Sequence, residues 1–165
     1  MRPAPIQFFA LLLPLVAACT PSLNWREVTP AGSHLQLTFP CKPEAAARDV
    51  AGLHQGLAKC DADGASFVLS WSGLRDPREA PEALKEMRAS LAARLQAAAG
   101  GTKPFVVPGM APQDEALQVE LNGSRHARVA TFARGEAVYE LLLISDTPIR
   151  QAAWEGFAGM IKFTD

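Results

Sequence analysis

Val138-Tyr139-Glu140-Leu141-Leu142-Leu143-Ile144 is a run of strand length that is apolar at almost every position. A strand with one face in water alternates apolar and polar side chains, whereas a strand covered on both faces is apolar nearly throughout. The run therefore predicts a central strand with other elements packed on both of its faces. Just before it, Arg134-Gly135 predicts a turn, so the preceding segment, residues 125–133, is expected to be a strand as well.

Farther from this run, alternation and tight turns predict more strands of the same sheet. Leu117, Val119 and Leu121 alternate with polar residues up to Asn122-Gly123, the strongest hairpin signal in the chain. Strands joined by such turns lie antiparallel. Four earlier segments have a similar character and are expected to be strands: 25–28, 35–39, 53–60 and 66–71.

Two segments change to the helical spacing of three and four residues. The first spans about residues 81–98 and ends before Gly100-Gly101; its apolar positions are Leu84, Met87, Leu91 and Leu95. The second begins with Thr147-Pro148 as cap and first residue; its apolar positions are Ile149, Ala153, Phe157 and Met160/Ile161. Together these elements predict an α+β fold, an antiparallel β-sheet covered by two main helices.

The first 18 residues are typical of an export signal. Arg2 and the amino terminus are positive, an apolar stretch follows, and small residues precede Cys19. The apolar stretch, residues 8–18, is shorter than the roughly 20 residues that a helix needs to cross a bilayer, and Pro14 interrupts it. We therefore expect a signal-peptide helix that is removed, and not a permanent transmembrane helix.

Val16-Ala17-Ala18-Cys19 resembles the lipobox of bacterial lipoproteins. The resemblance implies that the Cys19 thiol carries a diacylglycerol, that the signal is cut between Ala18 and Cys19, and that the new amino group is acylated with palmitate or a similar chain. The alternative is a plain secretory signal followed by a free or disulfide-bonded cysteine. By analogy with lipoprotein sorting, Thr20 in place of aspartate favours the outer membrane, with the domain facing the periplasm.

The expected organisation is a signal peptide over 1–18, a lipidated tether over 19–24 and a single α+β domain over 25–165. Three segments of that domain resemble the PsbP-like fold and a group of uncharacterised proteobacterial lipoproteins. They are Trp25-Arg26-Glu27-Val28, Phe39-Pro40-Cys41-Lys42-Pro43 and Phe157-x-x-Met160-Ile161-x-Phe163. The resemblance implies a fold, and it brings no family active site to any residue of this chain.

If Cys19 carries lipid, Cys41 and Cys60 remain as an even pair in an exported, oxidising setting. We expect a disulfide between them, which would close a loop of about twenty residues and contribute roughly 3 kcal/mol in the chain-entropy model. The alternative is a metal site that joins both sulfurs to His34 or His54. Zinc sites usually contain cysteines in a close C-x₂₋₄-C pair, and the sequence has none.

The charge balance gives no sign of a nucleic-acid partner. Without Arg2, the 16 basic side chains become 15, against 17 acidic ones, so the mature chain has a net charge of −2. We expect cross-strand pairs, or else a partner surface, from one set of charged residues: Arg125, Arg128, Arg134, Glu115, Glu120, Glu136 and Glu140. Trp154 lies off the apolar stripe of the last helix and is expected to be exposed.

The sequence contains no G-x-S-x-G elbow, H-E-x-x-H pair, phosphate loop or G-x-G-x-x-G motif. We therefore predict no catalytic, cofactor or metal residues. The expected function is a lipid-anchored, non-catalytic envelope domain whose partners are the membrane, through Cys19, and an envelope protein or small molecule. The alternative is an envelope hydrolase whose site is assembled from dispersed residues such as His54 or His126.

Overall fold

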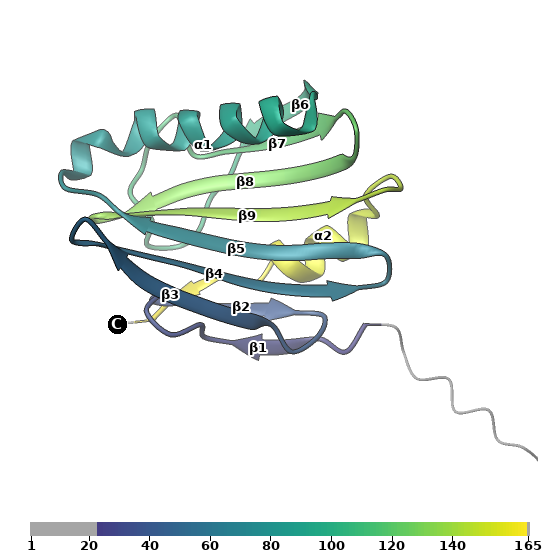
Figure 1. Ribbon diagram of the computed structural model, residues 1–165, viewed down its shortest axis with the longest axis horizontal. Helices are drawn as coiled ribbons and strands as arrows, with labels where there is room; N and C mark the ends of the chain where they lie inside the picture. The colour runs from purple at the N-terminus through teal and green to yellow at the C-terminus, as the bar shows by residue number, and fades with distance from the viewer. Residues whose placement is uncertain (1–22, 165) are drawn as a thin grey trace, which may run out of the picture.

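The computed structural model describes residues 23–164, and its main feature is a seven-stranded antiparallel sheet in the order β3-β4-β5-β9-β8-β7-β6 (Figure 1). Its strands are β3 (Glu44–Val50), β4 (Leu53–Ala62), β5 (Ala65–Gly73), β6 (Ala98–Pro104), β7 (Leu117–Asn122), β8 (His126–Arg134) and β9 (Ala137–Ser145). A short 3₁₀ turn, η1 (Pro77–Glu79), leads into α1 (Ala80–Leu95), and α2 (Gln151–Ala158) follows β9. The α+β prediction is therefore confirmed.

A second, small sheet consists of β1 (Arg26–Val28), β2 (Leu35–Phe39) and β10 (Lys162–Phe163), with β2 in the middle. It lies beside α2, on the opposite side of the large sheet from α1 (Figure 1). The Thr38 hydroxyl donates a hydrogen bond to the Gly156 carbonyl, which ties the small sheet to α2. The two helices thus cover opposite faces of the large sheet.

β9 is the central strand of the large sheet, as its apolar run predicts. It pairs with β5 on one side and with β8 on the other over its full length. Because side chains alternate along a strand, Tyr139, Leu141 and Leu143 pack toward α2 while Val138 and Leu142 pack toward α1. Both faces are covered, which explains the lack of polar alternation in the sequence.

The α2 face is an aromatic core. Phe157 of α2 has ring contacts with Phe39 of β2 (5.2 Å between centroids) and Phe67 of β5 (5.5 Å), and all three side chains are at most 1% exposed. Phe132 stacks on Tyr139 at 5.1 Å in the same core. Edge-to-face and offset ring contacts of this kind add to the free energy that burial itself contributes.

A disulfide joins the small sheet to the large one. Cys41 follows β2, Cys60 lies in β4, and their Cα atoms are 5.9 Å apart. The predicted pairing is thus present, and it leaves neither sulfur free for the alternative metal site. Ala18 and Cys19, with the cleavage site and lipid attachment predicted there, lie outside the described residues.

Three strands are not anticipated by the sequence pattern: β3, β6 and β10. All seven residues of β3 and of β6 are exposed, so neither strand alternates. Gly100-Gly101, expected to stop the first helix, lies inside β6, and the helix already ends at Leu95. The expectation that Trp154 is exposed is wrong. It is 3% exposed because α2 packs against both sheets, and its Nε1 donates to Gln118 Oε1 at 2.8 Å.

Candidate functional site

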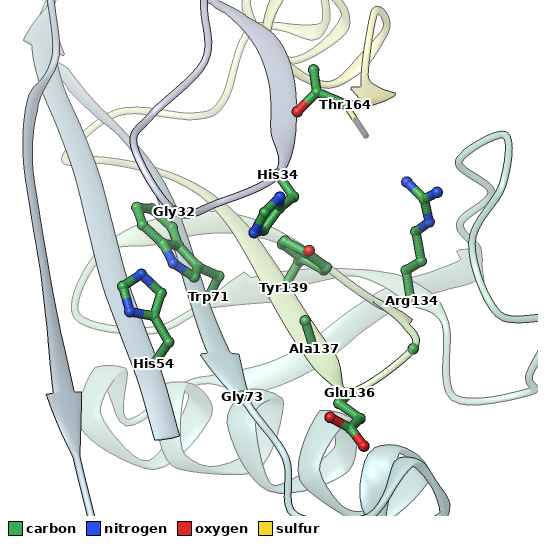
Figure 2. A pocket seen from close by; sticks show the side chains of 11 residues that line it. Gly32, His34, His54, Trp71, Gly73, Arg134, Glu136, Ala137, Tyr139 and Thr164 are labelled. Atoms are coloured by element: carbon green, nitrogen blue, oxygen red, sulfur yellow. The ribbon is translucent and has the colours of Figure 1, made fainter. Parts of the chain in front are cut away.

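An open cleft lies at the end of the large sheet where β4 begins and β5 and β8 finish (Figure 2). Its volume is about 640 Å³, within the range of small-molecule sites. The segments around it come from the loop before β2, strands β4 and β5, the β8–β9 turn and the end of the chain. The lining residues are Gly32, His34, His54, Trp71, Gly73, Arg134, Gly135, Glu136, Ala137, Tyr139 and Thr164.

Two aromatic side chains form the base of the cleft. Trp71 of β5 and Tyr139 of β9 are directly opposite each other in the sheet register, and they are 4% and 3% exposed. The indole lies against Gly56 of β4, where a Cβ would overlap the ring, so glycine is required at that position. The Trp71 Nε1 atom is buried and has no hydrogen-bond partner among the described residues.

Two imidazoles lie at the rim: Figure 2 shows His54 on the side of Trp71 and His34 next to Tyr139. His54 Nδ1 lies 3.1 Å from Asp49 Oδ1 across the β3–β4 pair, and a Cβ at Gly32 would overlap the His54 ring. His34 has a left-handed backbone (φ 52°), and its carbonyl accepts a hydrogen bond from the Thr164 amide at 3.0 Å. The loop before β2 is therefore held directly against His54 and the end of the chain.

Two charged residues at the β8–β9 turn, Arg134 and Glu136, line the cleft on the side away from His54 (Figure 2). The Arg134 guanidinium lies over the Phe163 ring, 4.6 Å from its centroid. Burial raises the pKa of the Tyr139 hydroxyl above its ordinary value, and the positive charge of Arg134 partly opposes this shift. Tyr139 is thus a neutral phenol at physiological pH. The bottom of the cleft is therefore aromatic and uncharged, and its rim is polar.

The structure separates the two histidines named for a dispersed hydrolase site. His54 lies in the cleft, whereas His126 begins β8, the strand that reaches the cleft only at its other end, at Arg134. His126 Nδ1 lies 2.9 Å from the Asn122 side-chain oxygen. The two imidazoles therefore belong to different parts of the molecule.

The predicted charge pairs are only partly formed. Arg128 pairs with Glu120 at 2.6 Å across the β7–β8 hairpin, as expected. Arg125 instead pairs with Asp146 at 2.6 Å, and Glu115 pairs with Arg88 of α1. Sequence patterning cannot show these partners because they come from a loop and a helix that approach the hairpin only in the folded chain.

Glu140 is the exception among these carboxylates. It lies opposite Ser70 and Thr131 on the α1 face of the sheet and is 8% exposed. Burial raises its pKa from 4.5 to about 7, although the Arg94 charge and a Ser70 hydrogen bond oppose the shift. The predicted hairpin pair is therefore replaced by a buried carboxyl.

Two cleft residues, Trp71 and Tyr139, are not identified as site residues by the sequence, and His34 is named there only as a ligand of the alternative metal site. Trp71 and Tyr139 read as core residues of their strands, and the structure shows that they are both core and cleft. His34 follows Gly32 in a turn, and only its distant contact with Thr164 places it at the rim. The sequence feature that could have identified His34 is the tight turn at residues 30–34, which brings this histidine toward the sheet.

Residues 23–164 contain neither a cluster of metal ligands nor a membrane-spanning helix. In this range no three His, Cys, Asp or Glu side chains come together in a way that would hold a metal ion. Nor does any helix in the same range have the length and apolar character needed to span a bilayer.

Comparison with known proteins assigns no family. No protein-family model matches the chain, and no curated protein matches it. A crystal structure of a protein from Bacteroides thetaiotaomicron VPI-5482 aligns with 83% of this chain at 9% identity and a TM-score of 0.39. The alignment spans 47% of that protein, so this chain covers about half of its length. A likeness of this strength identifies neither the fold nor the function.

Proposed function

We propose that this chain is a non-catalytic binding domain that takes a small ligand into the cleft over Trp71 and Tyr139. The single observation that carries the proposal is the cleft itself, about 640 Å³ with an aromatic base and a small number of polar groups at the rim. Binding sites for small molecules have this composition: apolar walls supply most of the contact area, and few polar groups fix the orientation.

The side chains favour a ligand with a flat, apolar part and a polar end. The flat part would lie against Trp71 and Tyr139, where stacking on aromatic rings adds to the effect of burying apolar area. The polar end would face His34 and His54, whose ring nitrogens donate or accept hydrogen bonds according to the tautomer. A ligand that is charged throughout fits less well, because the base of the cleft offers no ionised group.

Filling the cleft tests this function. Ala137→Leu enlarges a side chain that lines the cleft at the start of β9, and it should weaken binding of any cleft ligand at least tenfold. Ala99→Leu is the matched control, since it makes the same change on an exposed residue of β6. Isothermal titration of hits from a panel of small aromatic amphiphiles measures both variants. If Ala137→Leu binds like the original chain, the cleft is not the binding site.

We further propose that the domain is held on the membrane as a lipoprotein, facing the periplasm from the outer membrane, with Cys19 as the lipidated residue and Ala18–Cys19 as the cut bond. The Val16-Ala17-Ala18-Cys19 pattern supports this, and a disulfide is consistent with an exported setting. Cys19→Ser should abolish incorporation of labelled palmitate and leave the precursor uncut. Normal processing of this variant would refute the lipobox.

We also propose that the fold is PsbP-like. The support is an antiparallel sheet with one helix on each face, together with the sequence segments around Trp25, Pro40 and Phe163. An experimental structure, compared strand by strand with PsbP-like proteins, tests it; a different strand order in the large sheet would count against it.

Hydrolysis is the second candidate function, and one observation favours it: the Asp49–His54 pair at the rim. Such a pair orients an imidazole as a general base. However, no serine or cysteine is among the described residues that line the cleft, so neither of these nucleophiles lies beside His54 there. His54→Ala would abolish turnover of small esters if the chain were a hydrolase, and it would leave no activity to lose if the chain only binds.

A further inference from the structure

The two edges of the large sheet differ in how well they are protected against pairing with another strand. β6 has a bulge between Ala99 and Thr102 and ends with Lys103-Pro104, features that discourage further pairing. β3 has neither a bulge nor a proline, although three of its seven residues are charged: Glu44, Arg48 and Asp49. It pairs with β4 without interruption from Glu44 to Val50, and all seven of its residues are exposed in the described part of the chain.

The hairpin that follows β3 fixes which of its backbone groups point outward. Val50 and Leu53 flank the two-residue turn Ala51-Gly52, whose positive φ values of 52° and 80° indicate a type I′ turn. The residues that flank such a turn form a hydrogen-bonded pair, and these pairs alternate along an antiparallel ladder. Ala45, Ala47 and Asp49 therefore present their N–H and C=O groups to the open edge.

These outward groups restrict how a second copy of β3 could pair with the first. In a symmetric antiparallel pair, residues with outward backbone groups must oppose one another, so one of the residues 45 to 49 lies on the twofold axis. An axis at Arg48 or Asp49 places like charges directly opposite. An axis at Ala46 places Glu44 of each copy opposite Arg48 of the other, a non-hydrogen-bonded position where side chains are closest.

We propose that β3 is a homodimerisation edge, on which a second copy of this chain adds its own β3 antiparallel with the twofold axis at Ala46. A second copy fits this edge by its charge, because this register forms two Glu44–Arg48 pairs and places no like charges opposite each other. Apolar area supports it as well. Leu57 lies beside Ala46 in the register and is 43% exposed, so the dimer places one exposed leucine on each side of the axis. The proposal is independent of the ligand in the cleft.

Cysteine crosslinking of the full-length chain, produced in bacteria, tests the register. Ala46→Cys places two cysteines opposite each other, with Cα atoms about 4.5 Å apart, within reach of a disulfide. Ala47→Cys is the matched control: its two copies are diagonal, roughly 7–8 Å apart, and should not bond. The expected result is a dimer band on a nonreducing gel for Ala46→Cys only; the unsubstituted chain controls for Cys19.

Charge reversal in the Ala46→Cys background tests the proposed pairs. Arg48→Glu alone, or Glu44→Arg alone, should reduce the crosslinked fraction roughly tenfold or more, because two attractive pairs become repulsive. The double reversal should restore it. Both positions are exposed, so the monomer keeps its fold, which unchanged circular dichroism checks. Absence of crosslinking for Ala46→Cys, equal crosslinking for Ala47→Cys, or no restoration by the double reversal would each overturn the proposal.

Discussion

The two faces of the large sheet are built on different principles. The α2 face holds an aromatic core in which Phe39, Phe67 and Phe157 meet, and a second layer, the small sheet, covers it. The α1 face is covered by a single helix that packs chiefly on β7, β8 and β9. There, Arg88 of α1 donates to the Thr131 hydroxyl at 2.5 Å and pairs with Glu115, and the Glu140 carboxyl is buried beside them.

The difference shows that the two faces contribute to stability in different ways: the contribution of the α2 face is independent of pH, and that of the α1 face depends on protonation. Buried aromatic area has no dependence on pH, so the α2 face should act as a fixed support for the cleft at its end. Buried polar groups on the α1 face respond to protonation, and their free energy changes with pH. Each of the following substitutions acts on one face and leaves the other in place.

The largest expected effect is on the aromatic face. Phe157→Ala removes a fully buried ring that contacts both Phe39 and Phe67, and it should lower the free energy of unfolding by about 3 to 5 kcal/mol. Denaturant unfolding of the oxidised protein measures it. A loss below about 1 kcal/mol would mean that this core is not the main support.

Removal of the disulfide should have the next largest effect. Cys41 and Cys60 are 19 residues apart, so the Cys41→Ala/Cys60→Ala double substitution should cost roughly 3 kcal/mol in the chain-entropy model. The physical reason is that the unfolded chain gains freedom when the loop opens. The original protein unfolded with and without reductant is the natural control, and equal midpoints would contradict the prediction.

A smaller effect of opposite sign is expected on the α1 face. The pKa of Glu140 in the folded protein, about 7, is above its ordinary value of 4.5, so the folded state holds this proton more tightly. The stability from this group is complete below about pH 4.5 and is lost as the pH rises to 7. Glu140→Gln should therefore stabilise the protein at pH 8 by roughly 1 to 3 kcal/mol relative to its effect at pH 4.

Matched unfolding curves at the two pH values provide the check. Glu86→Gln is the control, because it removes a carboxylate from the exposed side of α1. If Glu140→Gln and Glu86→Gln change stability equally at both pH values, the Glu140 carboxyl is ionised in the fold without penalty, and the contrast between the faces is wrong in this respect.

The predictable parts of the fold are those in which one chain segment contains the whole signal. β9 and the β7–β8 hairpin are such parts, since an apolar run or an Asn-Gly dipeptide needs no distant partner to be recognised, although Asn122 pairs with His126 and the loop is residues 123–125. Glu44–Val50 has no such signal: an edge strand in full contact with water has neither a buried face nor a period.

Trp154 and the cleft show the other limit. A single apolar stripe predicts one buried side of α2, but this helix lies between two sheets, so a second side is buried too. The cleft brings together Gly32, Trp71 and Thr164, which are far apart in the sequence. Their proximity depends on the docking of the small sheet, which no local pattern encodes.

The most direct test of the central claim, that the cleft over Trp71 binds a small ligand, is fluorine NMR of the chain labelled with 5-fluorotryptophan. The chain has three tryptophans, and only Trp71 lines the cleft, so Trp25 and Trp154 are internal controls. Titration with a hit from the aromatic amphiphile panel should shift the Trp71 signal saturably and leave the other two in place. A saturable ligand that shifts Trp25 or Trp154 while Trp71 stays unchanged would contradict the account.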